Sequence, residues 1–305
     1  MADSNRPGAG RESRLDFLQQ VLSGCAIGCI YALVALGFVL IYKATEIINF
    51  AQGELLMLGA YFGYTFIGLW GMNYFAGALL AVGMTALVGA LLERALIRPM
   101  TGQPAFSIVM VTLGLGIVLR AVVTMVPGWG TESHTFATPF SNRTVTIGPL
   151  ILAQDHVAII LVTCLLVGLL YAFFTRTRIG VAMQAASQNQ MAAGYMGIPI
   201  KRVSTLIWAM SAAVAAIAGV LLAPITFIHS HLGFIGIKAF PAAVLGGFGS
   251  MPGAVVGGLI LGVCESLAGF YLPEGVKDVT AYVLLLAVLA FRPQGLFGQT
   301  TAKKV

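Results

Sequence analysis

Long uncharged apolar stretches constrain this chain more than any other feature of its sequence. The first runs from Phe17 to Tyr42, and stretches of similar character recur almost to the end of the chain. A helix needs roughly 20 apolar residues to cross the hydrocarbon core of a bilayer. Of the 305 residues, 58% are hydrophobic and 9% are charged, whereas about a quarter of the residues in a soluble domain are charged. The stretches do not alternate as barrel strands do, so the sequence predicts an all-α, polytopic transmembrane bundle.

The apolar pattern predicts about eight spans plus one interrupted or re-entrant segment. The interrupted segment is 236–250, which is too short and too rich in glycine for a straight span. The expected spans are residues 17–42, 55–71, 74–93, 104–126, 156–175, 203–224, 253–272 and 277–292. The expected domain organisation is a polar N-terminal tail (1–16), a single transmembrane domain (17–292) with a cytoplasmic loop (176–202), and a cytoplasmic C-terminal tail (293–305).

The distribution of Lys and Arg predicts the orientation, because cytoplasmic loops are enriched in these residues. Basic residues collect in the 94–98 loop, in the 176–202 loop and after residue 291, so these parts are expected inside. The 127–155 loop is then outside. Counting back places the N-terminus outside as well, although its tail contains three arginines, so the side of the N-terminus stays open.

Two breaks in the apolar pattern are the candidate translocation site. The first, at 42–54, reads YKATEIINFAQGE and supplies Asn49, Gln52 and Glu54. The second, at 245–253, reads LGGFGSMPG. Its candidate residues are Gly246, Gly247 and Ser250. Broken helices near corresponding points of the two halves of a membrane protein are typical of transporter sites. Non-helical backbone at depth in the membrane must be buried in protein or line a water-filled cavity. The alternative is that both breaks are hairpin turns between ordinary spans.

Two isolated charges lie inside predicted spans. A glutamate in a membrane helix is expected to face the bundle interior or a cavity. Glu265 is therefore included among the pathway candidates, and pairing with Lys277 or Lys238 is the alternative. Arg120 is expected to extend its side chain to the outer surface.

The largest cytoplasmic loop predicts a short helix over residues 181–197. Its Ala, Met and Gln residues favour helix, and Pro199 follows Gly197 as a stop signal. Small, weakly polar residues suit docking into the groove of a partner protein. A solvated connector is the alternative.

The sequence lacks the motifs that several kinds of chemistry require. No Gly-Lys dipeptide occurs, so the phosphate-binding loop GxxxxGK[ST] is absent and the chain is not expected to hydrolyse ATP. HExxH and GxSxG are also absent. His229 and His231 have no carboxylate close in sequence, and the basic residues form no stripe of the kind that binds nucleic acid. We therefore expect no catalytic residues, metal, cofactor or nucleic acid.

Five motifs give the sequence a resemblance to a known family. They are INFAQGELLMLGAY from Ile48, ERALIRPM at 93–100, QNQMAAGYMGI at 188–198, KAFPAAVLGGFGSMPGAVVGGLILGVCES at 238–266, and RPQGLFG at 292–298. Together they resemble the permease subunits of bacterial branched-chain amino acid ABC importers, of the LivH type. The resemblance covers nearly the whole chain.

The resemblance implies an ABC importer permease fold in the bacterial inner membrane. The implied partners are a homologous second permease (LivM-type), two cytoplasmic ATPase subunits (LivG/LivF-type) that bind ATP and Mg, and a periplasmic binding protein. The loop at 188–198 matches the family's contact with the ATPase, with Met191 where relatives usually have Glu; Gln52 stands where many relatives have His. The implied coupling residues are Ala185, Ser187, Asn189, Met191, Ala192, Ala193 and Gly197.

The sequence thus predicts a permease that moves Leu, Ile and Val by alternating access, with Asn49, Gln52 and Ser250 contacting the charged ends of the substrate. Urea, short-chain amides and other amino acids are the alternative substrates within the family. A stand-alone secondary transporter or channel is the more distant alternative.

Overall fold

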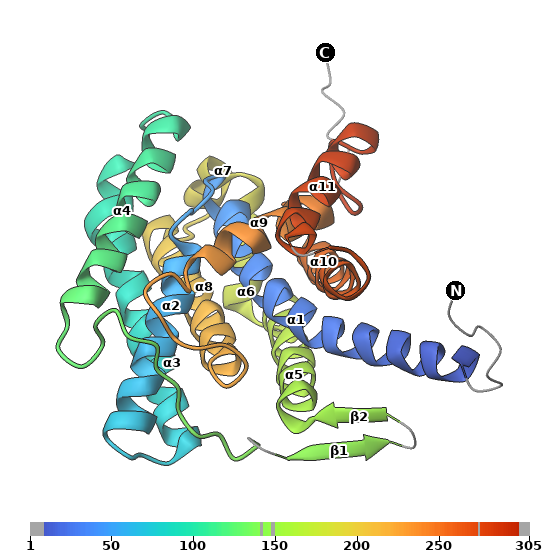
Figure 1. Ribbon diagram of the computed structural model, residues 1–305. Coiled ribbons are helices and arrows are strands. Elements are labelled where there is room, and N and C mark those ends of the chain that lie inside the picture. The colour runs from blue at the N-terminus through green and yellow to red at the C-terminus, as the bar shows by residue number, and fades with distance from the viewer. Residues whose placement is uncertain (1–8, 141–142, 148–149, 274, 299–305) are drawn as a thin grey trace.

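A computed structural model describes residues 9–140, 143–147, 150–273 and 275–298 and is predominantly helical (Figure 1). The helices are α1 (Ala9–Thr45), α2 (Gln52–Gly63), α3 (Tyr74–Leu92), α4 (Ala105–Met125), α5 (Gln154–Arg176), α6 (Arg178–Gln188), α7 (Gln190–Tyr195), α8 (Ile200–Leu222), α9 (Phe234–Gly246), α10 (Met251–Tyr271) and α11 (Val276–Phe291). Two π-helical segments, η1 (Tyr64–Leu69) and η2 (Glu93–Ile97), extend α2 and α3, and a 3₁₀ turn, η3 (Arg98–Met100), follows η2.

Six helices in the described part of the chain are long and apolar enough to cross a membrane. The polytopic helical bundle is therefore confirmed, whereas the predicted count of eight full-length spans is not. The two expected spans that fall short are 55–71, where 12 residues of α2 are followed by six of η1, and 277–292, where α11 has 16. The interrupted segment corresponds to the 13-residue helix α9, which contains Pro241.

Helix α1 is the most deeply buried of the long helices, and α10 packs along it. The two backbones approach so closely that a Cβ at Gly258 would lie 2.4 Å from Ala32 N, and one at Gly262 would lie 2.2 Å from Gly28 N. Small residues allow this kind of packing between membrane helices, where close van der Waals contact replaces the hydrophobic effect. In Figure 1, α4 lies at one flank of the bundle and α10 and α11 at the other.

The loop expected outside contains a short hairpin that the sequence analysis did not predict. Strands β1 (Thr144–Ile147) and β2 (Leu150–Ala153) are antiparallel, with Thr144 opposite Ala153. The β-branched residues of TVTI were an available signal, but the sequence analysis treated residues 127–155 only as a loop on the outer side. A backbone bridge between His134 and Ile228 joins this loop to the segment before α9.

The predicted cytoplasmic helix at 181–197 is two helices. Helix α6 ends at Gln188, and Asn189 accepts a hydrogen bond on its side chain from the Ala192 N–H (2.9 Å), which starts α7. An Asn side chain readily replaces a backbone partner at a helix start. The single-helix prediction was wrong because it gave Asn189 no capping role.

Candidate translocation pathway and coupling elements

Helices α2 and α9 begin beside each other inside the bundle. A Cβ at Gly53 would lie 2.0 Å from Gly233 O, and one at Gly236 would lie 2.4 Å from Gly53 Cα, so the two helix starts are in direct contact. The neighbouring Glu54 contacts α4 at Gly116, which is about 17 Å along α4 from its first residue. Both helices therefore start near mid-depth rather than at an end of the bundle. Non-helical backbone at such depth must be buried or reached by water.

Glu54 and Arg120 form an ion pair at this meeting point. Arg120 Nη2 donates to Glu54 Oε1 at 2.6 Å, and the Arg120 guanidinium lies 4.3 Å from the centroid of the Phe234 ring. The Glu54 side chain is 7% exposed and that of Arg120 is 25% exposed. The nearby starts of α2 and α9 carry partial positive charge, which favours the carboxylate. The expectation that Arg120 extends to the outer surface was wrong, because a buried carboxylate is within its reach.

The other polar residues of the first break make different contacts. Gln52 is fully buried; its Nε2 donates to Ser211 O (3.2 Å) and its Oε1 accepts from Ser211 Oγ (3.0 Å). Ser211 Oγ is also within hydrogen-bond distance of Gly37 O, so Gln52 and Ser211 tie α1, α2 and α8 together. Asn49 accepts from the Ala51 N–H through Oδ1 (3.1 Å), while its buried Nδ2 has no hydrogen-bond partner among the described residues. Asn49 thus keeps a donor available, whereas Gln52 has a structural role.

Glu265 belongs to a second network. Its Oε2 accepts from Tyr31 Oη at 2.5 Å, and its Oε1 lies 3.6 Å from Lys238 Nζ. Lys238 also donates to Asp278 at 2.5 Å. Of the alternatives left open by the sequence, the partner of Glu265 is Lys238, and the network joins α1, α9, α10 and α11. Tyr31 was missed by the sequence analysis, because a tyrosine in an apolar stretch gives no local sign of a carboxylate partner.

The second break lies at the opposite end of α9 from the start of α2. There the Phe248 ring packs against Tyr42, the first residue of the first break, with 4.9 Å between the ring centroids. Helix α9 separates Gly246 from the α2 start by about 18 Å, so the structure does not bring Gly246, Gly247 and Ser250 together with Asn49. Gly247 has a φ of +96°, and Ser250 caps α10 by accepting from the Gly253 N–H at 3.1 Å. The chain after α11 packs against this break: Leu296 N–H donates to Leu245 O (2.8 Å) and Phe297 N–H donates to Gly246 O (3.2 Å).

A cavity of about 670 Å³ lies between the first break and helices α6 and α7. Its lining comes from the end of α1, the segment before α4, and the ends of α6, α7 and α8. The residues are Thr45, Glu46, Ile47, Glu93, Ile97, Arg98, Thr101, Gly102, Gln103, Ala105, Ile108, Ala186, Gln190, Ile200, Lys201, Val203, Ser204 and Ile207. Since the 94–98 and 176–202 loops are expected inside, this cavity is the candidate cytoplasmic opening of the pathway.

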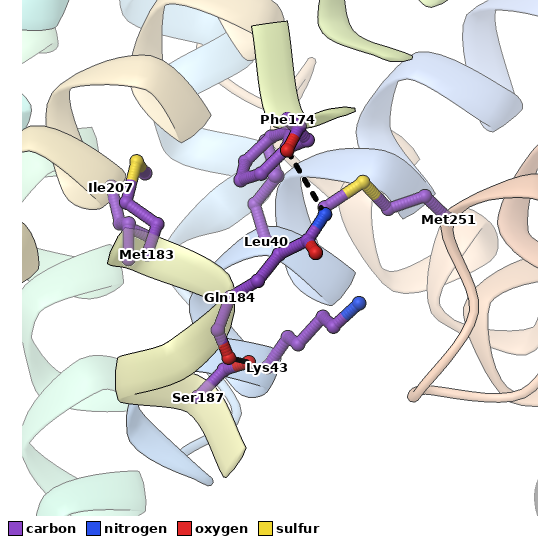
Figure 2. A pocket seen from close by; sticks show the side chains of 8 residues that line it. All are labelled: Leu40, Lys43, Phe174, Met183, Gln184, Ser187, Ile207 and Met251. Carbon is purple, nitrogen blue, oxygen red and sulfur yellow. Dashed lines mark hydrogen bonds between the residues drawn. The ribbon is translucent and has the colours of Figure 1, made fainter. Parts of the chain in front are cut away.

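Helix α6 packs against the end of α1, as Figure 2 shows. Met183 is buried and lines a small pocket with Leu40 and Lys43 of α1, while Gln184 Nε2 donates to Phe174 O at 3.2 Å. Because α1 ends only two residues after Lys43, a displacement of α6 would reach the first break directly.

The predicted coupling residues are divided between the bundle and the surface. Ala193 is buried, Ser187 is half-buried, and the rest are exposed: Ala185, Asn189, Met191, Ala192 and Gly197. Tyr195 (85% exposed) and Met196 (83%) were not among them, yet they join Met191 (72%) in an apolar surface on and just after α7. An exposed apolar surface of this kind is typical of a protein contact.

The loop before α9 carries two histidines, His229 and His231, separated by one residue. The His231 N–H donates to His229 Nδ1 at 3.2 Å. Burial and the neighbouring His231 lower the pKa of His229 below its ordinary value.

The chain matches the family described as "Branched-chain amino acid transport system / permease component" over residues 20–289. It is 36% identical over 310 residues to the high-affinity branched-chain amino acid transport system permease protein LivH of Escherichia coli K12, covering 96% of this chain and 99% of that protein. It is 33% identical to BraD of Pseudomonas aeruginosa, covering 95% and 98%, and 23% identical to LivM of E. coli K12, covering 89% and 68%.

The chain therefore belongs to the branched-chain amino acid permease family. It is a multi-pass membrane protein and a membrane transport subunit, and the resemblance predicted from the five motifs is confirmed.

Proposed function

We propose that the chain is one of the two permease subunits of an ATP-driven importer for Leu, Ile and Val in a bacterial inner membrane. The observation that carries this proposal is the match to LivH and BraD over nearly the full length of each protein. In this proposal the chain supplies half of the translocation pathway and has no catalytic role of its own.

The proposed partners follow from the family and from surfaces of the chain. The similarity to LivM supports a homologous second permease. The exposed apolar residues Met191, Tyr195 and Met196 support docking of α7 to a cytoplasmic ATPase. The two ATPase subunits would hold ATP and Mg, and a periplasmic binding protein would deliver the substrate.

The pathway is proposed to pass the meeting point of α2 and α9 and to open into the 670 Å³ cavity. At the meeting point, Asn49 offers a free amide donor, while Glu54 and Arg120 supply opposite charges at mid-depth. ATP-driven movement of the partner subunits would displace α6 and α7, and α6 would pass this movement to the end of α1. Alternating access would follow from the resulting change at residues 46–51.

The test is uptake of radiolabelled leucine into proteoliposomes that contain the chain with its partner permease, the two ATPases and the binding protein. We expect uptake that requires ATP and the binding protein, and that excess isoleucine or valine inhibits. A matched preparation without the ATPases is the control. Inhibition by urea or acetamide but not by isoleucine would replace the substrate assignment, and uptake by the chain alone would replace the ABC mechanism with a secondary transporter or channel.

A further inference from the structure

A second cavity, of about 570 Å³, lies between the inner ends of α3 and α8. Its lining residues are Arg94, Arg98, Lys201, Arg202, Thr205, Leu206 and Ala209. Four of these seven side chains are cationic and none is acidic. The cavity is therefore suited to an anion.

The positive charge of this cavity is largely unneutralised. Arg98 is the exception, because its Nη2 lies 3.0 Å from Glu93 Oε2 and 2.6 Å from Thr205 Oγ1. Even so, Arg98 Nε is buried without a hydrogen-bond partner among the described residues. Arg94, Lys201 and Arg202 are exposed, and none of them forms an ion pair within the part of the chain that the structure describes.

An apolar stripe leads along α3 to this cavity. It consists of Leu80, Met84, Leu87 and Leu91, which are between 39% and 55% exposed. Their spacing of four, three and four residues places them on one face of the helix. The stripe is about 17 Å long, and Arg94 follows it one turn later on the same side. An apolar strip of this length that ends in a cluster of cations matches the shape of a phospholipid.

We propose that the cavity and the stripe together bind one anionic phospholipid of the inner leaflet, with its phosphate among Arg94, Arg98, Lys201 and Arg202 and an acyl chain along Leu80–Leu91. Basic pockets between membrane helices on the cytoplasmic side are suited to such head groups. A free phosphate would use the cations and leave the stripe without a role. Arg98 and Lys201 also line the 670 Å³ cavity, so the bound lipid would brace one wall of the candidate pathway.

The test is native mass spectrometry of the full-length chain, purified in mild detergent and titrated with phosphatidylglycerol or phosphatidylcholine. We expect phosphatidylglycerol to bind about tenfold tighter, and the double variant R94Q/R202Q to lose at least about tenfold of this affinity, because each cation contributes separately to attraction of an anionic lipid. The matched control is R176Q/R178Q, which removes the same charge from exposed positions outside the cavity; it should stay within about twofold of the wild type.

A charge-retaining double variant and competition by inorganic phosphate test the proposal further. R94K/R202K retains the charge that attracts an anionic head group and should bind the lipid within about threefold of the wild type, which separates loss of the site from loss of folding. Equal binding of the two lipids, or equal losses in the two glutamine double variants, would overturn the proposal. Competition by millimolar inorganic phosphate that leaves no lipid preference would assign the cavity to a free anion instead.

Discussion

The two buried glutamates of this protein, Glu54 and Glu265, are both paired with a cation, but their surroundings differ. Glu265 has a hydroxyl partner and a lysine, and the lysine is itself held by Asp278. Glu54 has a single arginine partner, Arg120, which extends from α4. Four helices meet at Glu265, whereas Glu54 lies where two helices begin.

The difference in partners suggests different roles for the two glutamates. Glu265 holds the helices of the framework together, whereas Glu54 can change its partner during transport. A carboxylate in a closed network can be replaced only at the cost of leaving a cation and a hydroxyl without partners. A carboxylate with one ion-pair partner, beside two helix starts, can exchange that partner with a smaller penalty. We therefore assign Glu265 to the framework and Glu54 to the proposed pathway, although the sequence analysis placed both in the pathway.

The largest effect should come from Glu265→Ala. It leaves Lys238 and Tyr31 without their buried partner, and we expect the free energy of unfolding to fall by about 3 kcal/mol. Denaturant unfolding of the purified chain measures this change. Glu265→Gln should cost less, because its amide oxygen still accepts from Tyr31. If Glu265→Ala proved as stable as the wild type, the contrast between the two glutamates would be lost.

Gly53→Ala should have the next largest effect. The added Cβ would lie 2.0 Å from Gly233 O and would separate the starts of α2 and α9. We expect a loss of about 1–3 kcal/mol, accompanied by reduced leucine uptake. Gly83→Ala on α3 is the matched control, because its Cβ would meet nothing within 4 Å. Equal stability of the two variants would contradict the direct contact between the helix starts.

Glu54→Gln should affect transport more than stability. The amide can still accept from Arg120, but the pair loses its negative charge at mid-depth. We expect leucine uptake to fall about tenfold, equivalent to about 1.4 kcal/mol, while the unfolding free energy falls by less than in Glu265→Ala. Uptake in proteoliposomes and denaturant unfolding are measured on the same preparation. Uptake near the wild-type level would remove Glu54 from the proposed pathway.

The smallest effect should come from Asp278→Asn at the edge of the Glu265 network. The Asp278 side chain is 70% exposed, and exposed ion pairs contribute less than about 1 kcal/mol. Denaturant unfolding at low and high salt checks this expectation. A loss as large as that of Glu265→Ala would mean that Lys238 depends on Asp278 rather than on Glu265.

Much of the fold was predictable because membrane spans are defined by local composition. The spans at 74–93, 104–126, 156–175 and 253–272 lie within a few residues of α3, α4, α5 and α10. The spans predicted at 55–71 and 277–292 were less successful, since apolar composition alone does not show that α2 starts at mid-depth or that α11 stops after 16 residues.

The candidate site was predicted only in part. The break at 42–54 was recognised from its polar residues, but their separate roles follow from contacts distant in sequence, such as Gln52 with Ser211 and Glu54 with Arg120. Glycine-rich sequence identified the second break equally well, yet α9 holds Gly246 about 18 Å from the start of α2, and the two breaks meet instead where Tyr42 packs against Phe248. A polar residue in a break can be recognised from the local sequence, whereas its hydrogen-bond or ion-pair partner cannot.

The sequence by itself determined that this protein is a polytopic helical bundle, because a bilayer imposes span length and composition on each segment separately. Its five motifs, rather than its composition, gave the resemblance to the branched-chain amino acid permease family. Only the tertiary structure decided which charges meet. Arg120 comes from α4, two helices after Glu54, and packing selected Lys238 of α9 rather than Lys277 for Glu265. A buried charge takes the partner that packing brings within reach, at 2.6 Å for Glu54 and 3.6 Å for Glu265.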